Sequence, residues 1–551
     1  MSAPVPKPSA EARMRAYHEA TKHRLNGYAP APGFLDWDSQ PDPFRRWKGA
    51  PIIDLPLVED SARRSYDDLY RVELGDSDPL TLGSLSLFLE KAWGLSGWKS
   101  LGPDRWSMRH NPSSGNLHPT ECYLLLWQVG ETGLEPGLYH YAPEQHLLER
   151  RARLTPEAAR AATAKAPGAF GAIGLSTVTW REEWKYGARA YRYCQLDVGH
   201  ALGAAGFSAL TRGWRLACDP TLSDACVSAL LGLDRAFTRS EAEPEAPDLM
   251  ALFGPDPTGR IDGAALAESL TDWRGEPSSL SEECVRWPQV VQAHAAGLKS
   301  ETRARPFDVP GPHPLSRADR SGLAATDLIS QRRSAQRMDP EGRIGLDDFK
   351  RILARLLPST SGPFGLWPHP PALHPVLFVH GVEGLDPGLY LLLRDGDQYP
   401  RLRMGMIRGR FAWQPIEDLP LFRLKAPWDL RKTANKLCCN QGISGRGAFS
   451  MGLVADLSLI EAEGAATWRR LHWEAGLIGQ VLYLEAESVA LSGTGIGCFF
   501  DDEVNRTFGL ETGPEAPWGV VYHFTVGLAK VDKRLVSEPA YGDRRWIREA
   551  R

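Results

Sequence analysis

The chain has 551 residues, of which 42% are hydrophobic and 24% charged, and its net charge is −4. That length exceeds what one hydrophobic core usually serves, so two domains are expected in a globular protein of ordinary composition. The lack of a long basic block excludes nucleic acid and anionic membranes as expected partners, and no apolar run approaches the roughly 20 residues of a membrane helix. Residues 1–30 lack the apolar centre of a signal peptide, which predicts a cytoplasmic location.

Periodicity of the apolar residues predicts helices and strands throughout the first half. The helices cover about 9–25, 80–93 and 191–210, and the strands cover 122–129, 172–178 and 249–253. The helix at 191–210 is rich in Ala and Gly, which indicates a closely packed central position, and the strand at 249–253 is interpreted as a short closing strand.

Residues 256–319 differ in character, with many Asp, Pro, Gly and Arg residues and one helix-like piece near 290–298. The segment is too long for a compact loop, so it is interpreted as an interdomain linker that wraps over the surface.

Several features of the first half return in the second half in the same order. Leu-His-Pro and then Pro-Gly-Leu-Tyr occur at 117–119 and 136–139, and again at 373–375 and 387–390. Two glycines stand 12 positions apart at 187–199 and 464–476, two stand 14 positions apart at 199–213 and 479–493, and Gly-Leu precedes an acidic residue at 232–234 and 509–511. A repeat of this kind predicts two copies of one α+β unit. The predicted division is an extension at 1–57, a domain at 58–255, the linker at 256–319 and a second domain at 320–551.

The eight cysteines show neither a Cys-x-x-Cys pair nor a metal-ligand spacing. This pattern predicts buried thiols in a reducing compartment rather than disulfides. His369 and His374 stand close together among prolines, but two histidines alone do not make a metal site. We therefore predict no metal.

The stretch 109–119 reads Arg-His-Asn-Pro-Ser-Ser-Gly-Asn-Leu-His-Pro and stands between a predicted helix and a predicted strand. Its Pro, Gly, Ser and Asn residues predict an ordered loop that turns backbone N–H groups and side-chain oxygens outward, where they can hold a polar ligand. A plain turn is the alternative on composition alone.

Together with Gly-Leu-Tyr-His-Tyr at 137–141, this loop resembles the flavin-covering loop of the nitroreductase superfamily. The Pro-Gly-Leu-Tyr step and the sequence Lys185-Tyr186-Gly187 resemble most closely the SagB-type dehydrogenases, which oxidise azoline rings in modified peptides. The resemblance implies an FMN bound between two units, one of which grips the phosphate and ring edge while the other covers the flavin. Since both units occur in one chain here, the expected fold class is α+β, with two fused nitroreductase-like domains that form an intramolecular pseudo-dimer.

The second half resembles the family at the positions that grip the flavin. Residues 331–340 resemble its Arg-Arg-Ser-x-x-Arg phosphate motif, because guanidinium groups and a hydroxyl suit a dianion, with a solvated basic face as the alternative. Residues 530–534 resemble a second phosphate contact, with a basic tail as the alternative. Residues 493–498 resemble the Gly turn beside flavin N5, and Gln441 stands about where the family offers an amide to the pyrimidine edge. The cofactor-binding residues that the resemblance implies are Pro112, Ser113, Ser114 and Asn116 from the first half, and Arg332, Arg333, Ser334, Arg337, Gln441, Gly495, Ile496, Gly497, Lys533 and Arg534 from the second.

Each half departs from the family where the other half keeps it. The first half has Gly-Trp-Arg-Leu-Ala-Cys at 213–218 in place of the Gly turn. The second half has Pro-His-Pro-Pro-Ala at 368–372 in place of the covering loop, and Ala-Glu at 462–463 in place of Lys185-Tyr186. These complementary losses predict one working flavin site and one vestigial site.

The resemblance assigns Lys185 and Tyr186 to the proton step of a dehydrogenase that passes a hydride from a small-molecule or modified-peptide substrate to FMN. From the residues alone, a surface lysine beside a packing tyrosine is the alternative. Two other functions stay open, namely an NAD(P)H-dependent reductase of nitro or quinone compounds and a flavin-free, non-catalytic scaffold. The shared Leu-His-Pro favours a structural turn role for both His118 and His374.

Overall fold

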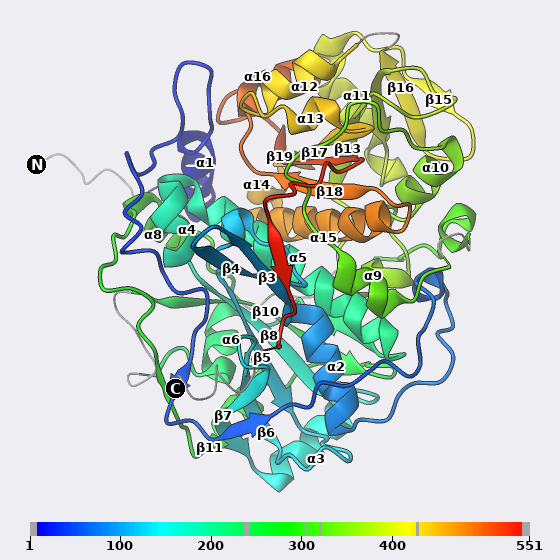
Figure 1. The fold of residues 1–551 in the computed structure, drawn as a ribbon. Helices are drawn as coiled ribbons and strands as arrows, with labels where there is room; N and C mark the ends of the chain where they lie inside the picture. Colours follow the sequence, from blue (N-terminus) through cyan, green and yellow to red (C-terminus); the bar gives the residue numbers. More distant parts are fainter. Residues whose placement is uncertain are drawn as a thin grey trace, which may run out of the picture.

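The structure, a computed structural model, describes residues 8–235, 243–300, 302, 307–318, 322–425 and 429–542. It consists of two α+β units, each built around one antiparallel sheet (Figure 1). The first sheet contains β5 (Thr120–Leu126), β6 (Gly137–Ala142), β7 (Leu147–Leu154), β8 (Gly171–Val178), β9 (Arg215–Cys218), β10 (Glu245–Gly254) and β11 (Leu270–Thr271), with β2 (Ile52–Asp54) beside β7. The second contains β13 (Leu373–Val379), β14 (Gly388–Leu392), β15 (Gln414–Ile416), β16 (Leu421–Lys425), β17 (Phe449–Asp456), β18 (Ser492–Ile496) and β19 (Trp518–Gly527). The predicted α+β fold with two fused domains is confirmed.

The two sheets share one strand order. The first runs β7-β6-β5-β8-β10-β9 and the second runs β16-β14-β13-β17-β19-β18. The predicted closing strand is wrong in extent and place, since β10 has ten residues and lies between β8 and β9. The tyrosines of the repeated Pro-Gly-Leu-Tyr make the same contact in both sheets, because Tyr139 donates to the Glu135 carbonyl at 2.6 Å and Tyr390 donates to the Asp386 carbonyl at 2.8 Å.

The strand register corrects one of the echoes between the halves. Leu126 pairs with the first residue of β6 and of β8, and Val379 pairs with the first residue of β14 and of β17, so these two residues are equivalent. The two histidines stand at different distances from these equivalent residues, because His118 precedes β5 whereas His374 lies inside β13. The shared turn role predicted for the two histidines is therefore wrong.

Two buried central helices form the contact between the units. They are α5 (Ala190–Thr211) and α15 (Thr467–Glu487), and every residue of α5 is buried, as its composition indicates. They meet at glycines: a Cβ on Gly199 would lie 2.1 Å from the Trp473 carbonyl oxygen, and a Cβ on Gly476 would lie 2.1 Å from that of Leu196. This reciprocal contact is the pattern of a two-fold interface, here within one chain.

Buried ion pairs repeat the same symmetry on both sides of the crossing. Arg469 of the second unit pairs with Asp224 of the first at 2.5 Å, and Arg192 of the first pairs with Asp501 of the second at 3.3 Å. Each carboxylate also accepts a backbone N–H at 2.9 Å, Asp224 from Lys299 and Asp501 from His23.

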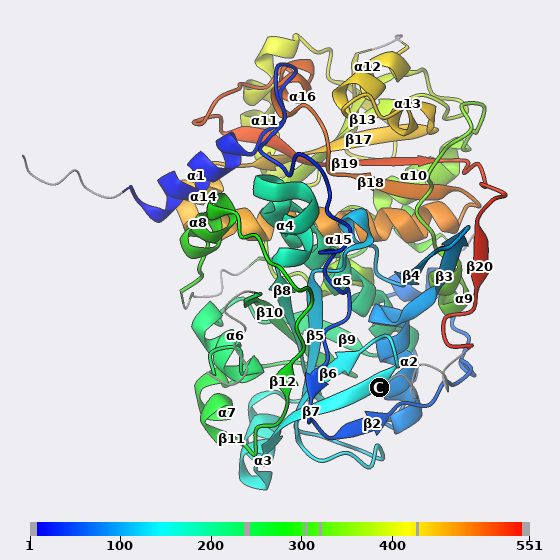
Figure 2. The ribbon, with the colours of Figure 1, turned by 60° about the vertical axis from the view of Figure 1, so that its left-hand side comes forward.

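The two backbone donors each follow a short helix. These helices are α1 (Ala10–Ala20) in the predicted extension and α8 (Pro288–Ala296) in the predicted linker, and they lie side by side (Figure 2). Helix α8 of the predicted linker thus precedes the donor to Asp224 in the same way as helix α1 precedes the donor to Asp501. The boundaries predicted after residues 57 and 255 stay predictions, and the one after residue 319 lies outside the described residues.

The C-terminal part of the second unit returns to the first. Strand β20 (Val536–Glu538) pairs with the hairpin of β3 (Leu95–Leu101) and β4 (Asp104–Arg109), as Figure 2 shows. This hairpin leads directly into the loop at 109–119.

The remaining helices and strands are β1 (Trp47–Lys48), β12 (Glu276–Pro277), α2 (Leu82–Trp93), α3 (Pro156–Lys165), α4 (Trp180–Tyr186), α6 (Asp224–Leu231), α7 (Gly263–Ser269), α9 (Ala325–Gln331), α10 (Leu346–Ala354), α11 (Tyr399–Gly405), α12 (Arg431–Leu437), α13 (Ile443–Arg446), α14 (Leu459–Glu463) and α16 (Asp501–Thr507). Among the described helices, none is both long and apolar enough to cross a membrane.

Candidate active site

The loop at 109–119 is ordered, but its polar side chains hold the loop itself. Ser114 donates its N–H and its hydroxyl to the carboxylate of Asp197 on α5, at 3.1 and 3.0 Å. Ser113 Oγ accepts the His118 N–H at 2.8 Å, and Asn116 Nδ2 donates to the Ser107 carbonyl at 2.8 Å. These bonds correct the predicted outward orientation of the side-chain oxygens. Pro112 is buried, and the exposed tip of the loop is Gly115.

Lys185 and Tyr186 lie against this tip. They end α4, and the next residue turns the chain with a φ of 55° that favours glycine. A Cβ placed on Gly115 would lie 2.7 Å from Tyr186 Oη and 3.1 Å from Lys185 Nζ. The covering loop and the predicted catalytic pair are therefore in contact. Burial raises the pKa of Tyr186 well above its usual value, so its phenol keeps its proton.

A tyrosine on α5 connects this pair to the second unit. The rings of Tyr186 and Tyr193 have centroids 4.4 Å apart, and the Tyr193 hydroxyl donates to the Gly497 carbonyl at 3.3 Å. Gly497 belongs to the predicted Gly turn. The predicted covering loop, the predicted catalytic pair and the predicted Gly turn thus meet at one place, although they come from both halves of the chain.

Residues 493–496 of the predicted Gly turn belong to the edge strand β18, and the glycines at 495 and 497 are required by aromatic neighbours. A Cβ on Gly495 would lie 1.8 Å from Tyr522 Oη, and one on Gly497 would lie 2.1 Å from Tyr193 Cε1. Ile496 is buried and pairs with His523 of β19. The glycines are therefore required by packing against aromatic rings, whereas the prediction attributed them to the close approach of a flavin.

Strand register also corrects how the two Gly-turn segments align. Arg215 of β9 pairs with the last residue of β10, and Ser492 of β18 pairs with the last residue of β19. Leu216 and Cys218 therefore stand at the places of Gly493 and Gly495, three positions away from the predicted alignment. The first half still lacks the glycines.

Gln441, the residue predicted to contact the pyrimidine edge, lies beside this turn. It is exposed, and its Nε2 donates a hydrogen bond to the Cys498 carbonyl at 3.2 Å.

The predicted phosphate motif joins the two units. Arg332 is buried and donates to the carbonyls of Arg109 and His110, at 2.9 and 3.2 Å, at the start of the predicted covering loop. Its third guanidinium nitrogen, Nη1, is buried and finds no hydrogen-bond partner in the described part of the chain. Arg333 donates to the Ser96 carbonyl of β3 at 2.8 Å. Both guanidinium groups thus bind first-unit backbone.

The other residues predicted to contact the phosphate lie at the surface. Ser334, Arg337, Lys533 and Arg534 are exposed. The Ser334 hydroxyl is 2.9 Å from that of Tyr483, and Arg534 pairs with Asp532 at 2.7 Å. The two predicted phosphate segments are neighbours, because the Lys530 N–H donates to the Arg337 carbonyl at 2.9 Å.

Comparison with known proteins places this geometry in a known fold. No family model matches the chain. A putative nitroreductase of Methanocaldococcus jannaschii is 34% identical over 128 residues, which cover 22% of this chain and 60% of that relative, so the match spans less than two thirds of its length. The crystal structure of a putative nitroreductase from Anabaena variabilis aligns with a TM-score of 0.66 and 23% identity, over 94% of this chain and 99% of that one. This chain has a nitroreductase fold.

The candidate site contains two buried acids that the motifs did not reveal. Burial raises the pKa of Asp197, the acceptor of the Ser114 bonds, to about 7. Glu182, one helical turn before Lys185, is buried, and neither carboxylate oxygen has a hydrogen-bond partner within the described residues. Burial and the nearby Asp197 raise the pKa of Glu182 well above its usual value. The sequence did contain one indication of Asp197, because it is an acidic residue inside a helix predicted to be central. A buried carboxylate needs hydrogen-bond partners.

A cavity occupies the place related to this site by the pseudo-two-fold. It has a volume of about 370 Å³ and is lined by Lys299, Pro368, His369, Glu463, Arg470 and Trp473, among others. Glu463 and Arg470 stand at the places of Tyr186 and Tyr193 and pair with each other at 2.6 Å. The aromatic contact of the first site is thus replaced by an ion pair.

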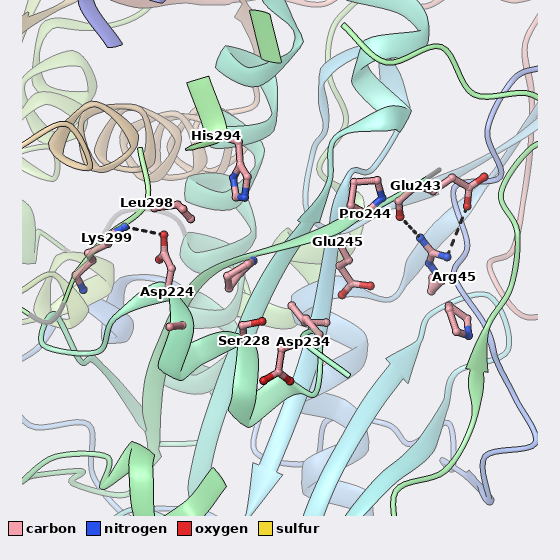
Figure 3. Close-up of a pocket in the computed structure, with 14 residues that line it drawn as sticks. Arg45, Asp224, Ser228, Asp234, Glu243, Pro244, Glu245, His294, Leu298 and Lys299 are labelled. Carbon is pink, nitrogen blue, oxygen red and sulfur yellow. Dashed lines mark hydrogen bonds and ion pairs between the residues drawn. The ribbon is translucent and has the colours of Figure 1, made fainter. Parts of the chain in front are cut away.

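A larger cavity of about 540 Å³ contains none of the predicted site residues (Figure 3). Two of its acidic lining residues are already bonded within the protein: Glu243 accepts the Leu280 N–H at 2.9 Å, and Glu245 accepts the Tyr123 and Ser176 hydroxyls at 2.6 Å. Among the described residues, no group of three or more His, Cys, Asp or Glu is arranged to hold a metal ion.

Proposed function

We propose that the chain is an FMN-dependent oxidoreductase with one composite site, and that it acts as a SagB-type dehydrogenase on a small molecule or an azoline ring in a modified peptide. The observation that supports this best is the contact of Gly115 with Lys185 and Tyr186, extended through Tyr193 to Gly497. It joins the predicted covering loop and catalytic pair to the predicted Gly turn. A tandem duplication, supported by the shared strand order and the reciprocal helix crossing, explains how one chain came to contain both parts.

The donor set fits the flavin phosphate through its exposed members. Ser334, Arg337 and Lys533 offer a hydroxyl and two cations that suit a phosphate dianion. Arg332 and Arg333 are positioning residues in this proposal, because their guanidinium groups hold first-unit backbone beside the covering loop. When bound, FMN supplies hydride acceptance at N5.

The chain itself supplies the proton step. Lys185 is the proposed base toward the substrate atom that loses a proton, because its Nζ lies at the exposed loop tip. Tyr186 keeps its proton and therefore acts as a hydrogen-bond donor that orients the substrate.

Single-turnover reduction of the FMN-reconstituted chain by an azoline-containing peptide tests this proposal. We expect Lys185→Ala to slow flavin bleaching by about 100-fold, the usual contribution of a general base, while flavin content is unchanged. Lys165→Ala, at an exposed position at the end of α3, is the matched control and should react like the parent chain. Equal rates for both variants would refute the role of Lys185.

Two other results would favour the alternative functions. Rapid bleaching of the flavin by NAD(P)H without azoline oxidation would indicate a nitro or quinone reductase instead, and failure of the chain to bind FMN would indicate a scaffold.

A further inference from the structure

Two cysteines outside the proposed catalytic pair are in direct contact. Cys439 lies in the loop between α12 and α13, and Cys498 lies just after β18. Both are free thiols, and their Sγ atoms are 2.6 Å apart. Sulfur atoms this close need only a small movement to form a disulfide bond.

The backbone presents Cys439 in an unusual conformation. Cys439 and the following Asn440 both have positive φ values, of 52° and 60°. Non-glycine residues adopt this region rarely, and they do so mostly where the surrounding structure holds them there. Two in succession direct the Cys439 side chain toward Cys498, whose carbonyl accepts a hydrogen bond from Gln441 of the same loop.

Basic groups gather around Cys498. The chain at His23 forms a bridge with Phe500, so that its imidazole reaches the thiol, and Arg189 donates to the carbonyl of the preceding residue at 3.0 Å. Contact with the Cys439 thiol, together with His23 and Arg189, lowers the pKa of Cys498 to about 5. The thiolate is the form of cysteine that attacks disulfides.

The other cysteines of comparable position lack these features. Cys284 is half-buried like Cys439 and Cys498, but burial raises its pKa to about 12. Cys438 is adjacent to Cys439 in sequence, yet it is buried beside His523, with its Sγ 3.5 Å from the ring Nδ1, and burial raises its pKa to about 12 as well. Cys284 and Cys438 therefore serve as references that are expected to react more slowly.

We propose that Cys439 and Cys498 form a thiol–disulfide exchange centre that small-molecule disulfides oxidise. The Cys498 thiolate attacks one sulfur of the small disulfide, which forms a mixed disulfide and releases one small thiolate. Cys439 then loses its proton and attacks Cys498 Sγ, which forms the Cys439–Cys498 bond and releases the second small thiolate. Two electrons pass from the protein to the small disulfide, which leaves as two thiols after it takes up one proton from Cys439 and one from solvent.

The bond would tie the loop between α12 and α13 to the end of the Gly turn. Gly497, one residue before Cys498, accepts the bond from Tyr193, which contacts Tyr186. Oxidation would therefore fix the backbone beside the proposed flavin site. The exchange itself needs no flavin, so it can be tested separately from the proposed function.

Mass spectrometry of the full chain tests the proposal. The reduced chain is incubated with hydroxyethyl disulfide, quenched at intervals with N-ethylmaleimide and digested without reductant. We expect a cross-linked pair of peptides containing Cys439 and Cys498, lighter by two hydrogen atoms than the two thiol peptides together. Its formation should be on the order of tenfold or more faster than modification of Cys284, because the Cys498 thiolate is present at neutral pH.

Two variants assign the roles. Cys439→Ser should accumulate a lasting mixed disulfide on Cys498, while Cys438→Ser, the matched control in the same peptide, should form the cross-link like the parent chain. The proposal is overturned if the parent chain retains the mixed disulfide, if both cysteines are recovered as alkylated thiols after Cys284 has reacted, or if Cys438→Ser abolishes the link. The parent chain alone decides the first two of these outcomes, so a variant that fails to fold does not leave the question open.

Discussion

At the proposed site, Asp197 fixes the covering loop by accepting the N–H and the hydroxyl of Ser114. Its carboxylate is buried in α5, and burial raises its pKa to about 7, well above the ordinary value for an aspartate. Between these two pKa values the folded chain holds a proton on Asp197 that the unfolded chain has lost. The contribution of Asp197 to the free energy of unfolding therefore falls as pH rises through this range.

The change Asp197→Asn isolates this effect, because asparagine stays neutral at every pH. Buried histidines such as His200, whose pKa burial lowers to about 3, change stability with pH in the opposite sense, so the variant must be compared with the parent chain. Between about pH 5 and pH 8, urea unfolding should show the variant gaining about 1–3 kcal/mol relative to the parent. Asp38→Asn, at an exposed position, should show no such gain. A pH-independent difference for Asp197→Asn would contradict the buried acid.

Among the elements, the crossing of α5 and α15 sets how the two units meet. A Cβ on either Gly199 or Gly476 would meet a backbone carbonyl of the other helix at 2.1 Å, and backbone cannot move aside as a flexible side chain can. The helices would have to separate, and the ion pairs of Arg192 and Arg469 on both sides of the crossing would be strained.

Gly199→Ala and Gly476→Ala should therefore each lower the free energy of unfolding, by about 1–3 kcal/mol, the usual cost of overpacking. Because both methyl groups open the same gap, the double variant should lose less than the sum of the two single losses. Gly396→Ala is the matched control, since a Cβ there meets nothing within 4 Å. Urea unfolding measures all four, and full additivity or a cost no larger than that of Gly396→Ala would disprove the reciprocal contact.

The motifs predicted elements and site residues to different degrees. Apolar periodicity located the central helix and the strands, because burial determines those positions. The length and place of β10 were wrong, and the helix predicted at about 9–25 ends at Ala20. Counting along the sequence misaligned the Gly turn and the Leu-His-Pro echo by three positions, because strand register depends on pairing that spacing does not encode. Residue types at the site were predictable, but partners were not. Arg332 resembles a phosphate ligand in sequence and binds the carbonyls of Arg109 and His110 in the structure.

On the scale of the whole molecule, each unit contributes a different part of one proposed site. The covering loop and the Lys185-Tyr186 pair come from the first unit, and the Gly turn and basic motif come from the second. At the place related by the pseudo-two-fold, Glu463 and Arg470 form an ion pair where the first site has two tyrosines. The expected cytoplasmic location, and a small-molecule or modified-peptide substrate as the partner, stay predictions.

The number of flavins per chain tests this division most directly. The purified chain is saturated with FMN, freed of unbound flavin, and its flavin absorbance is compared with its protein concentration. One composite site and one lost site predict one FMN per chain. Two equally occupied flavins per chain, or a chain that retains none, would contradict the account.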